Sequence, residues 1–318
     1  MPSTTEVPGG IETDSNLGGL RVLVTGAAGF IGSAVCRKLR RSGADVHGTS
    51  RVPRDDEGVR WWQADLADPA ITRQLMQGLR PDLVIHLASH VSGDRALGAV
   101  LPTVRDNLLT TVNLLLAACE TGAPRVVIAG SMESDLENPR AIPGSPYAAA
   151  KTAASTYARM FHSLYDLPLV HLRIFMVYGP GQRDTTKLIP YVTTALLRGE
   201  QPDLTSGSRK VDWVYVDDVV TAVITAALAA DANGKVIDVG SGELVTIRAV
   251  VDQITQLVGS TTQPRFGALN DRPLEHERVA HVSRTFDLLG WRPATSLDDG
   301  LARTVQWYRT RQLLTEDS

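Results

Sequence analysis

The sequence has few of the features that mark secreted, metal-binding or membrane proteins. It contains only two cysteines, Cys36 and Cys119, with neither a CxxC pair nor the spacing of a zinc site. The longest apolar run, residues 219–230, is interrupted by threonines and is too short to cross a bilayer. The N-terminus lacks the basic and apolar regions of a signal peptide. These absences predict a cytoplasmic protein without a membrane segment and without a metal.

An excess of charge of one sign is also missing. The 32 Lys and Arg residues face 35 Asp and Glu residues, which leaves a net charge of −3. Nucleic acids and anionic membrane surfaces are bound through clustered basic excess, so neither is an expected partner. The hydrophobic content of 43% is enough for a packed core and excludes wholesale disorder.

Short apolar segments alternate with amphipathic ones along most of the chain. Residues 1–19, rich in Ser, Thr, Gly and Pro, predict a flexible N-terminal tail. Beyond them strands are expected at 21–25, 45–49, 59–64, 82–88, 125–129, 169–177, 211–216 and 235–239. Helices are expected at 31–41, 71–79, 104–120, 148–165, 187–198, 219–229, 247–258 and 297–310. This alternation predicts an α/β fold with a doubly wound parallel sheet.

A glycine-rich turn follows the first expected strand and opens the first helix. Its sequence, TGAAGFIG, places Gly26 at a tight turn, Gly29 where a backbone approaches a pyrophosphate, and Gly32 where helix and strand pack closely. The helix N-terminus adds unpaired N–H groups for phosphate oxygens. The turn predicts a Rossmann site for a dinucleotide whose contacts include Gly26, Ala28, Gly29, Phe30, Ile31 and Gly32.

The end of the second strand bears on which dinucleotide binds. An acid that would bind a ribose 2′-hydroxyl is absent there, and Ser50 and Arg51 occupy the position instead. A guanidinium matches the geometry of a 2′-phosphate. NADP(H) is therefore the expected cofactor, with NAD(H) possible and a solvated surface arginine as the alternative role of Arg51.

Three polar side chains form the expected catalytic set. Tyr147 and Lys151 lie one turn apart on an expected helix, and a lysine cation there is expected to lower the pKa of the phenol. Ser131 follows the fifth strand, at the edge where α/β sheets place their ligands. Asn107 matches an asparagine that often joins this set, although a structural role is equally open.

These motifs together resemble the extended short-chain dehydrogenases that act on nucleotide sugars. The resemblance runs from about residue 21 to residue 308. It rests on the glycine turn, HLA at 86–88, Ser131, SPY at 145–147 with Lys151, Arg173 with YGP at 178–180, DWVYVDD at 212–218 and GWRP at 290–293. It implies an NAD(P)-binding Rossmann domain over 20–180, with 211–240 contributing, and a smaller α/β lobe, mainly 181–318, that binds the substrate.

The resemblance also implies further site residues and an assembly. Expected cofactor contacts are Ser50, Arg51, Asp65, Leu66, Leu87, Ala88, Ser89, Asn107, Tyr147 and Lys151. Expected contacts to a nucleoside-diphosphate sugar are His90, Ser131, Met132, Met176, Arg209 and Arg272. Two positions depart from the family pattern, because Met176 replaces the usual asparagine and Val211 the usual arginine, for which Arg209 is a substitute. The helices at 104–120 and 148–165 would form the face of a homodimer.

The same catalytic set serves three reactions on a nucleotide sugar. The interpretation preferred here is NADPH-dependent reduction of a nucleoside-diphosphate 4-keto-6-deoxyhexose at C4, because Arg51 suits a consumable NADPH. A nucleotide-sugar epimerase is the alternative, as is a 4,6-dehydratase in which Glu133, two residues after Ser131, acts as an acid or base. A non-enzymatic sensor of NADP(H) is disfavoured because Tyr147 and Lys151 are both present.

Overall fold

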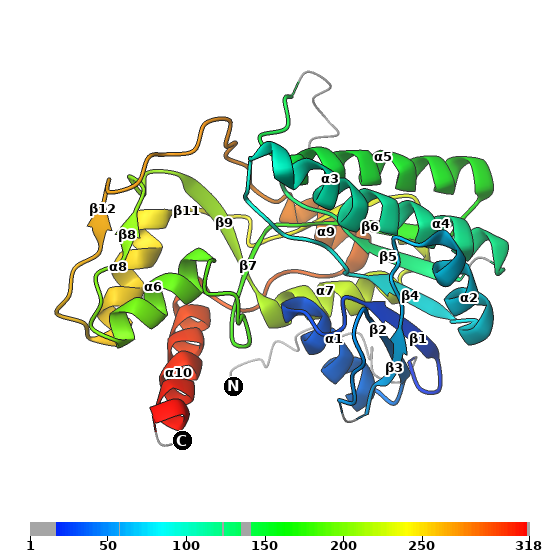
Figure 1. Ribbon diagram of the computed structural model, residues 1–318, viewed down its shortest axis with the longest axis horizontal. Coiled ribbons are helices and arrows are strands. Elements are labelled where there is room, and N and C mark those ends of the chain that lie inside the picture. The colour runs from blue at the N-terminus through cyan, green and yellow to red at the C-terminus, as the bar shows by residue number, and fades with distance from the viewer. Residues whose placement is uncertain (1–16, 57, 123, 135–140, 317–318) are drawn as a thin grey trace, which may run out of the picture.

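A seven-stranded parallel sheet forms the centre of the larger part of the molecule (Figure 1). The computed structural model describes residues 17–56, 58–122, 124–134 and 141–316. The strands lie in the order β10-β6-β5-β4-β1-β2-β3, and each neighbouring pair is parallel. They are β1 (Arg21–Thr25), β2 (Asp45–Ser50), β3 (Arg60–Gln63), β4 (Leu83–His86), β5 (Arg125–Ala129), β6 (Leu169–Ile174) and β10 (Val236–Val239). The order reverses between β1 and β4, where open α/β sheets bind ligands at the carboxyl ends of their strands.

Helices cover both faces of this sheet. On one face α1 (Phe30–Arg41) packs against α7 (Val216–Leu228), and α9 (Val282–Leu289) packs against β10. On the other face α2 (Pro69–Leu79) packs against α4 (Thr110–Glu120), and α4 against α5 (Pro146–Tyr165). A helical stretch leads into α4, made of η1 (Leu97–Ala99), α3 (Val100–Thr103) and a π-helix, η2 (Val104–Leu109).

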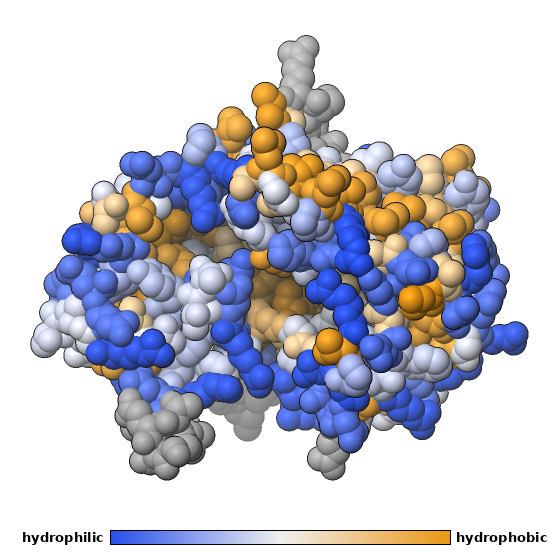
Figure 2. Space-filling view, in the orientation of Figure 1, coloured by the Kyte–Doolittle hydropathy of each residue, from blue (hydrophilic) through white to orange (hydrophobic). Residues whose placement is uncertain are grey.

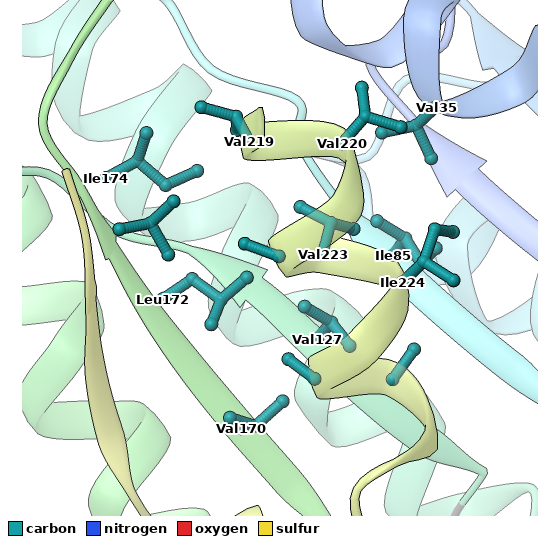
Figure 3. Close-up of a cluster of buried hydrophobic side chains, with 14 of the residues drawn as sticks. Val35, Ile85, Val127, Val170, Leu172, Ile174, Val219, Val220, Val223 and Ile224 are labelled. Atoms are coloured by element: carbon teal, nitrogen blue, oxygen red, sulfur yellow. The ribbon is translucent and has the colours of Figure 1, made fainter. Parts of the chain in front are cut away.

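The core beneath α7 shows why this helix forms. Its apolar side chains Val219, Val220, Val223 and Ile224 point at the sheet, where apolar and mostly β-branched residues of three strands meet them (Figure 3). The strand residues include Ile85, Val127, Val170, Leu172 and Ile174, and Val35 reaches the same cluster from α1. Because a parallel sheet is buried on both faces, its strands are apolar almost continuously. A second cluster fills the space between the sheet and helices α2, α4 and α5.

A smaller lobe follows β6. A three-stranded sheet, β11-β9-β7, and a two-stranded one, β12-β8, pack with helices α6, α8 and α10 around a third apolar cluster. The elements are β7 (Met176–Tyr178), α6 (Leu188–Leu197), β8 (Asp203–Leu204), β9 (Lys210–Tyr215), β11 (Leu244–Thr246), α8 (Ile247–Val258), β12 (Arg265–Phe266) and α10 (Leu297–Glu316), whereas η3 (Ala230–Ala232) packs against α9 beside the main sheet. Within 211–240, β9 belongs to the smaller lobe, whereas α7 and β10 return to the main sheet.

The predicted α/β fold with a doubly wound parallel sheet is confirmed, but α9, β8, β11 and β12 were not predicted, and three predicted segments differ in detail. The strand expected at 169–177 is two strands, because β6 ends at Ile174 and β7 pairs with β9 in another sheet. The helix expected to begin at 104 begins with a π-helical turn. Leu17, placed in the flexible tail, is fully buried, so chain packing begins before residue 19; residues 1–16 lie outside the described part. No described helix has the length and apolarity needed to span a membrane.

Candidate active site

The turn after β1 is shaped so that only glycine fits at two of its positions. Gly26 has a φ of +67°, and a Cβ atom there would lie 2.7 Å from the backbone nitrogen of Ala88. A Cβ atom on Gly32 would lie 2.1 Å from the carbonyl oxygen of Gly26. The turn is therefore pressed against both α1 and the segment after β4. This close approach agrees with the roles expected for Gly26 and Gly32.

Helix α1 begins directly after this turn along the chain. Its N-cap, Gly29, has an extended conformation and provides no side-chain acceptor, so the first N–H groups of the helix have no side-chain cap. These groups come from Phe30, Ile31 and Gly32, and an anion placed there would also meet the positive end of the helix dipole. The residues of this turn therefore fit a dinucleotide pyrophosphate.

The carboxyl ends of β2 and β3 carry the residues expected near the adenosine. The side chain of Arg51 is 66% exposed, and its guanidinium lies 3.2 Å from Asp106. Asp65 contacts Arg105, which also pairs with Asp106 at 2.7 Å. The four charges form one exposed network at this edge of the sheet, in which Arg51 already has a carboxylate partner.

Ser131, Tyr147 and Lys151 converge at the carboxyl end of β5. Ser145 caps α5 by accepting from the backbone nitrogen of Ala148, which fixes the first turn that carries Tyr147. All three predicted catalytic side chains are more than nine-tenths buried. The Lys151 Nζ atom donates to the carbonyl oxygen of Ala129 at 2.8 Å and lies 5.9 Å from the centre of the Tyr147 ring.

The pKa of Tyr147 is higher than the sequence predicts. Burial raises it most, the Glu133 carboxylate also raises it, and hydrogen bonds to Ser131 and Ser89 lower it, which together bring the pKa to about 12. The sequence predicted a pKa lowered by Lys151, whereas the net shift is upward because desolvation of the phenolate dominates. The same burial lowers the pKa of Lys151 to about 8. Tyr147 is consequently held as a neutral phenol beside a lysine that gives up its proton easily.

Replacement of Lys151 by Met should abolish turnover yet stabilise the fold. Burial of the ammonium costs free energy, so the variant should gain about 2 kcal/mol of unfolding free energy at pH 7. The folded pKa of about 8 lies below the ordinary 10.5, so the wild-type penalty is complete below pH 8 and disappears as the pH rises above 10.5. Urea unfolding of both proteins across this range measures the difference. A constant difference would contradict a buried, titrating lysine.

Asn107 holds the segment after β4 rather than facing the catalytic set directly. Its Oδ1 accepts from the His90 nitrogen at 2.6 Å and from Ser89 Oγ at 3.1 Å, while its Nδ2 donates to the His90 carbonyl at 3.0 Å. The structural role considered for Asn107 is therefore present. Leu87 and Ala88 lie between this anchor and the Gly26 turn.

A pocket that is open to solvent lies beside the catalytic set. Figure 2 shows the molecule hollowed between the main sheet and the smaller lobe. Four arginines line the pocket together with acidic and apolar residues. The lining includes Gly93, Arg95, Met132, Glu133, Ile142, Pro143, Arg209, Arg272, Leu274, Glu275, His276 and Arg278. Such a lining suits a ligand that is anionic at one end.

The pocket collects some of the expected substrate residues and not others. Met132, Arg209 and Arg272 line it, as does Glu133, which was expected as an acid or base, whereas Ser131 does not. Arg209 lies 3.2 Å from Glu275, and its Nε atom is buried without a hydrogen-bond partner, which fits its expected place near a phosphate. His90 and Met176 do not line the pocket: His90 is exposed, and Met176 packs between two apolar clusters. Their contact with substrate stays a prediction.

Two arginines of the pocket were not expected from the sequence. Arg278 donates to the carbonyl oxygens of Met132 and Ser134, at 3.3 and 3.1 Å. Arg95 donates to the Pro273 carbonyl oxygen at 2.5 Å. Both join the loop after a strand of the main sheet to the segment 272–280, which is far away in sequence. No local pattern signals such contacts.

The class of protein follows from this fold and this site. Residues 22–240 match the model of the NAD dependent epimerase/dehydratase family, and the chain belongs to that family. It is an enzyme of the extended short-chain dehydrogenase type, whose relatives act on nucleotide sugars.

The chain is similar over most of its length to individual relatives and solved structures. It is 32% identical to a UDP-glucose 4-epimerase of Mycolicibacterium smegmatis, over 92% of this chain and 99% of the relative. It is 31% identical to a dTDP-glucose 4,6-dehydratase of Streptomyces niveus, over 91% of this chain and 93% of that protein. The structure resembles that of a UDP-glucose 4-epimerase of Thermus thermophilus in complex with NAD, with a TM-score of 0.81, 28% identity, and coverage of 91% and 99% of the two chains.

Proposed function

We propose that the protein is a nucleoside-diphosphate hexose 4-epimerase. The observation that carries the proposal is the buried set of Ser131, Tyr147 and Lys151 beside an arginine-lined pocket, with apolar Met132 directly after Ser131. Elimination of water from a hexose needs both an acid and a base, and Met132 can act as neither. Among the described residues 131–134, Glu133 is the one carboxylate that lines the pocket, which supports epimerisation over dehydration.

The chain's own residues account for the proton transfer. A bound dinucleotide supplies the hydride acceptor and donor. The phenolate form of Tyr147 takes the proton of the substrate 4-hydroxyl, is a neutral phenol while the sugar turns, and returns the proton to the oxygen, while Ser131 hydrogen-bonds the same oxygen. Lys151 stabilises the phenolate before and after this transfer, and Arg209 and Arg272 hold the diphosphate. Burial of the catalytic set excludes water from the reacting atoms.

The proposal is tested by the product formed from UDP-glucose, UDP-galactose and dTDP-glucose. The expected result is interconversion of a pair of 4-epimers, followed by NMR, without net change in nicotinamide absorbance. A 4-keto-6-deoxy product would replace the proposal with dehydration through Glu133. Absence of any product would overturn an activity on these sugars.

A second function, the 4-ketoreduction of a nucleoside-diphosphate 4-keto-6-deoxyhexose, is favoured by Arg51. Its exposed guanidinium at the end of β2 would attract a 2′-phosphate and so favour NADPH, which a reductase consumes. The change Arg51→Ala should weaken NADPH binding about tenfold or more and leave NADH binding unchanged. Fluorescence titration of both cofactors measures this. Arg60→Ala is the control, because Arg60 is equally exposed and pairs with Asp45 at the opposite end of the sheet.

NADPH oxidation by the wild-type protein with a 4-keto-6-deoxy sugar would establish the reductase. Equal losses of NADPH and NADH affinity in Arg51→Ala would contradict a role in selecting the phosphorylated cofactor. The pairing of Arg51 with Asp106 supports the opposite preference, for NAD(H), because the carboxylate competes with a 2′-phosphate.

We further propose which part of the molecule binds each ligand, and that the protein is a homodimer. The main sheet with α7 and β10 would bind the cofactor, and the smaller lobe would bind the sugar nucleotide. A homodimer is supported by large apolar side chains exposed on α3, η2, α4 and α5, where Figure 2 shows an apolar area. They include Leu101, Val104, Leu109, Leu116, Tyr157 and Leu164. A monomer mass in sedimentation equilibrium would contradict this assembly.

A further inference from the structure

The turn after β5 that carries Ser131 is buried, although it belongs to no strand or helix. Ser131, Met132 and Ser134 are each at most 7% exposed. Two hydrogen bonds of 3.0 Å close the turn and tie it to the sheet, from the Ser134 nitrogen to the Ser131 carbonyl oxygen and from the Met132 nitrogen to the Ile174 carbonyl oxygen. Buried backbone groups outside regular structure need partners from elsewhere in the molecule. The carbonyl oxygens of this turn are therefore groups that a distant side chain can hold.

Arg278 supplies such a partner from the segment that follows β12. Its Nη1 atom donates to the carbonyl oxygen of Met132 at 3.3 Å and to that of Ser134 at 3.1 Å. The side chain is half-buried and lines the pocket, as does Glu133. One cation thus holds the carbonyl groups of both chain neighbours of Glu133.

The Met132 carbonyl belongs to the same peptide unit as the Glu133 N–H. A trans peptide unit is planar, so its C=O and its N–H point in opposite directions and turn together. The Glu133 nitrogen donates to the Ser131 Oγ atom at 3.2 Å. A guanidinium on one side of this peptide therefore sets the direction of the N–H that reaches the Ser131 hydroxyl on the other side.

The same contact decides what the Ser131 hydroxyl can do. A hydroxyl oxygen that accepts from a backbone N–H keeps its own proton for another acceptor. A cation on the carbonyl polarises the peptide and strengthens the hydrogen bond that its N–H gives, because hydrogen bonds in a chain reinforce one another. Ser131 is thereby prepared to donate to a substrate oxygen, and the charge of Arg278 acts on it through the peptide.

We propose that Arg278 is a positioning residue, which acts through the peptide after Met132 on the hydroxyl of Ser131. The proposal rests on the proposed function in one respect, namely that Ser131 hydrogen-bonds the reacting oxygen during turnover. Arg278 lies six residues after Arg272, which we expect at the diphosphate. The two ends of the segment 272–278 would thus serve different steps, Arg272 in ligand binding and Arg278 in the chemical step.

The test uses Arg278→Ala, with Arg309→Ala as the matched control. Arg309 is also half-buried, and its guanidinium donates to two carbonyl oxygens at 3.1 and 3.3 Å, those of Leu257 and Val258 at the end of α8. Hydride transfer from UDP-glucose is followed in single turnover on the cofactor-loaded protein, and the affinity for UDP by calorimetric titration. Arg278→Ala should lower the rate of hydride transfer about tenfold and leave UDP affinity within about twofold of the wild type. Arg309→Ala should match the wild type in both.

A double-mutant cycle separates action through Ser131 from a general loosening of the site. In a Ser131→Ala background, Arg278→Ala should cost less than about twofold, because the hydroxyl that it positions is gone. An equal tenfold loss in both backgrounds would overturn the proposal, as would a loss confined to UDP affinity, which would assign Arg278 to the diphosphate. Arg278→Lys keeps a cation that can donate to the Met132 carbonyl and should recover most of the rate. It also serves as the test variant if the alanine protein does not fold, and a lysine protein as slow as expected for alanine would then contradict the proposal.

A further readout does not depend on turnover. The amide hydrogen of Glu133, observed by NMR, should exchange with solvent about tenfold faster in Arg278→Ala than in the wild type or in Arg309→Ala, because its peptide is no longer held. Unchanged exchange would overturn the proposal. A wild-type protein that converts no nucleotide sugar, but whose Glu133 amide responds as described, would overturn the proposed function and leave the action of Arg278 on the turn standing.

Discussion

Replacement of Tyr147 by Phe should lower turnover by about 1,000-fold without loss of cofactor binding. The ring of Tyr147 is buried at the start of α5, and phenylalanine preserves its packing while removing the hydroxyl that we propose exchanges a proton with the substrate. General acid–base groups contribute about 10²- to 10⁴-fold to rate, and burial makes substitution by water difficult here. Single-turnover kinetics together with cofactor titration separate the chemical step from binding.

The matched control is Tyr157→Phe on the same helix, because the Tyr157 side chain is 42% exposed. Its turnover should equal that of the wild type, and both variants should unfold at the wild-type temperature. Undiminished turnover of Tyr147→Phe would show that another group moves the proton, and the proposed mechanism would be abandoned.

The change Gly32→Ala should have the second large effect, on cofactor binding and on stability together. The added methyl group would lie 2.1 Å from the Gly26 carbonyl oxygen. That oxygen cannot retreat easily, because Gly26 is itself pressed against the backbone of Ala88. We expect a loss of about 3 kcal/mol of unfolding free energy, as for other overpacked positions, and at least a 100-fold (about 2.7 kcal/mol) weaker affinity for NAD(H) and NADP(H).

Gly98→Ala is its control, since nothing lies within 4 Å of a Cβ atom at that position. Calorimetric titration and urea unfolding should leave this variant at wild-type values. A Gly32→Ala protein that binds cofactor normally would show that the turn can widen, and that its tight packing is not what shapes the phosphate site.

The local sequence predicts a strand of this fold well where burial of both faces makes its residues apolar. The strands of the main sheet are short and apolar because both of their faces are buried, and Val126, Val127 and Ile128 illustrate this pattern. The break at Phe175 was not predictable in the same way. Phe175 is buried, and the apolar run continues through it, but the partner strand changes from β10 to β9. Only long-range pairing separates the two strands.

The site shows the same limit. Spacing was enough to bring Ser131, Tyr147 and Lys151 together, because a strand end and one helical turn set their geometry. The pKa of Tyr147 was misjudged, since one nearby lysine is visible in the sequence and the degree of burial is not. The contacts of Arg278 depend on segments more than 140 residues apart, so they follow from tertiary packing alone.

The position of β10 at the edge of the main sheet also matters during protein synthesis. Its neighbour β6 ends at Ile174, whereas β10 begins only at Val236. The chain between them forms β7, α6, β8 and β9 of the smaller lobe before it returns through α7. At about 5–20 residues per second, the ribosome needs several seconds to supply the missing edge. During that interval the nascent chain carries β6 as an open strand that another polypeptide can pair with. The main sheet is therefore completed only after several elements of the smaller lobe have been synthesised.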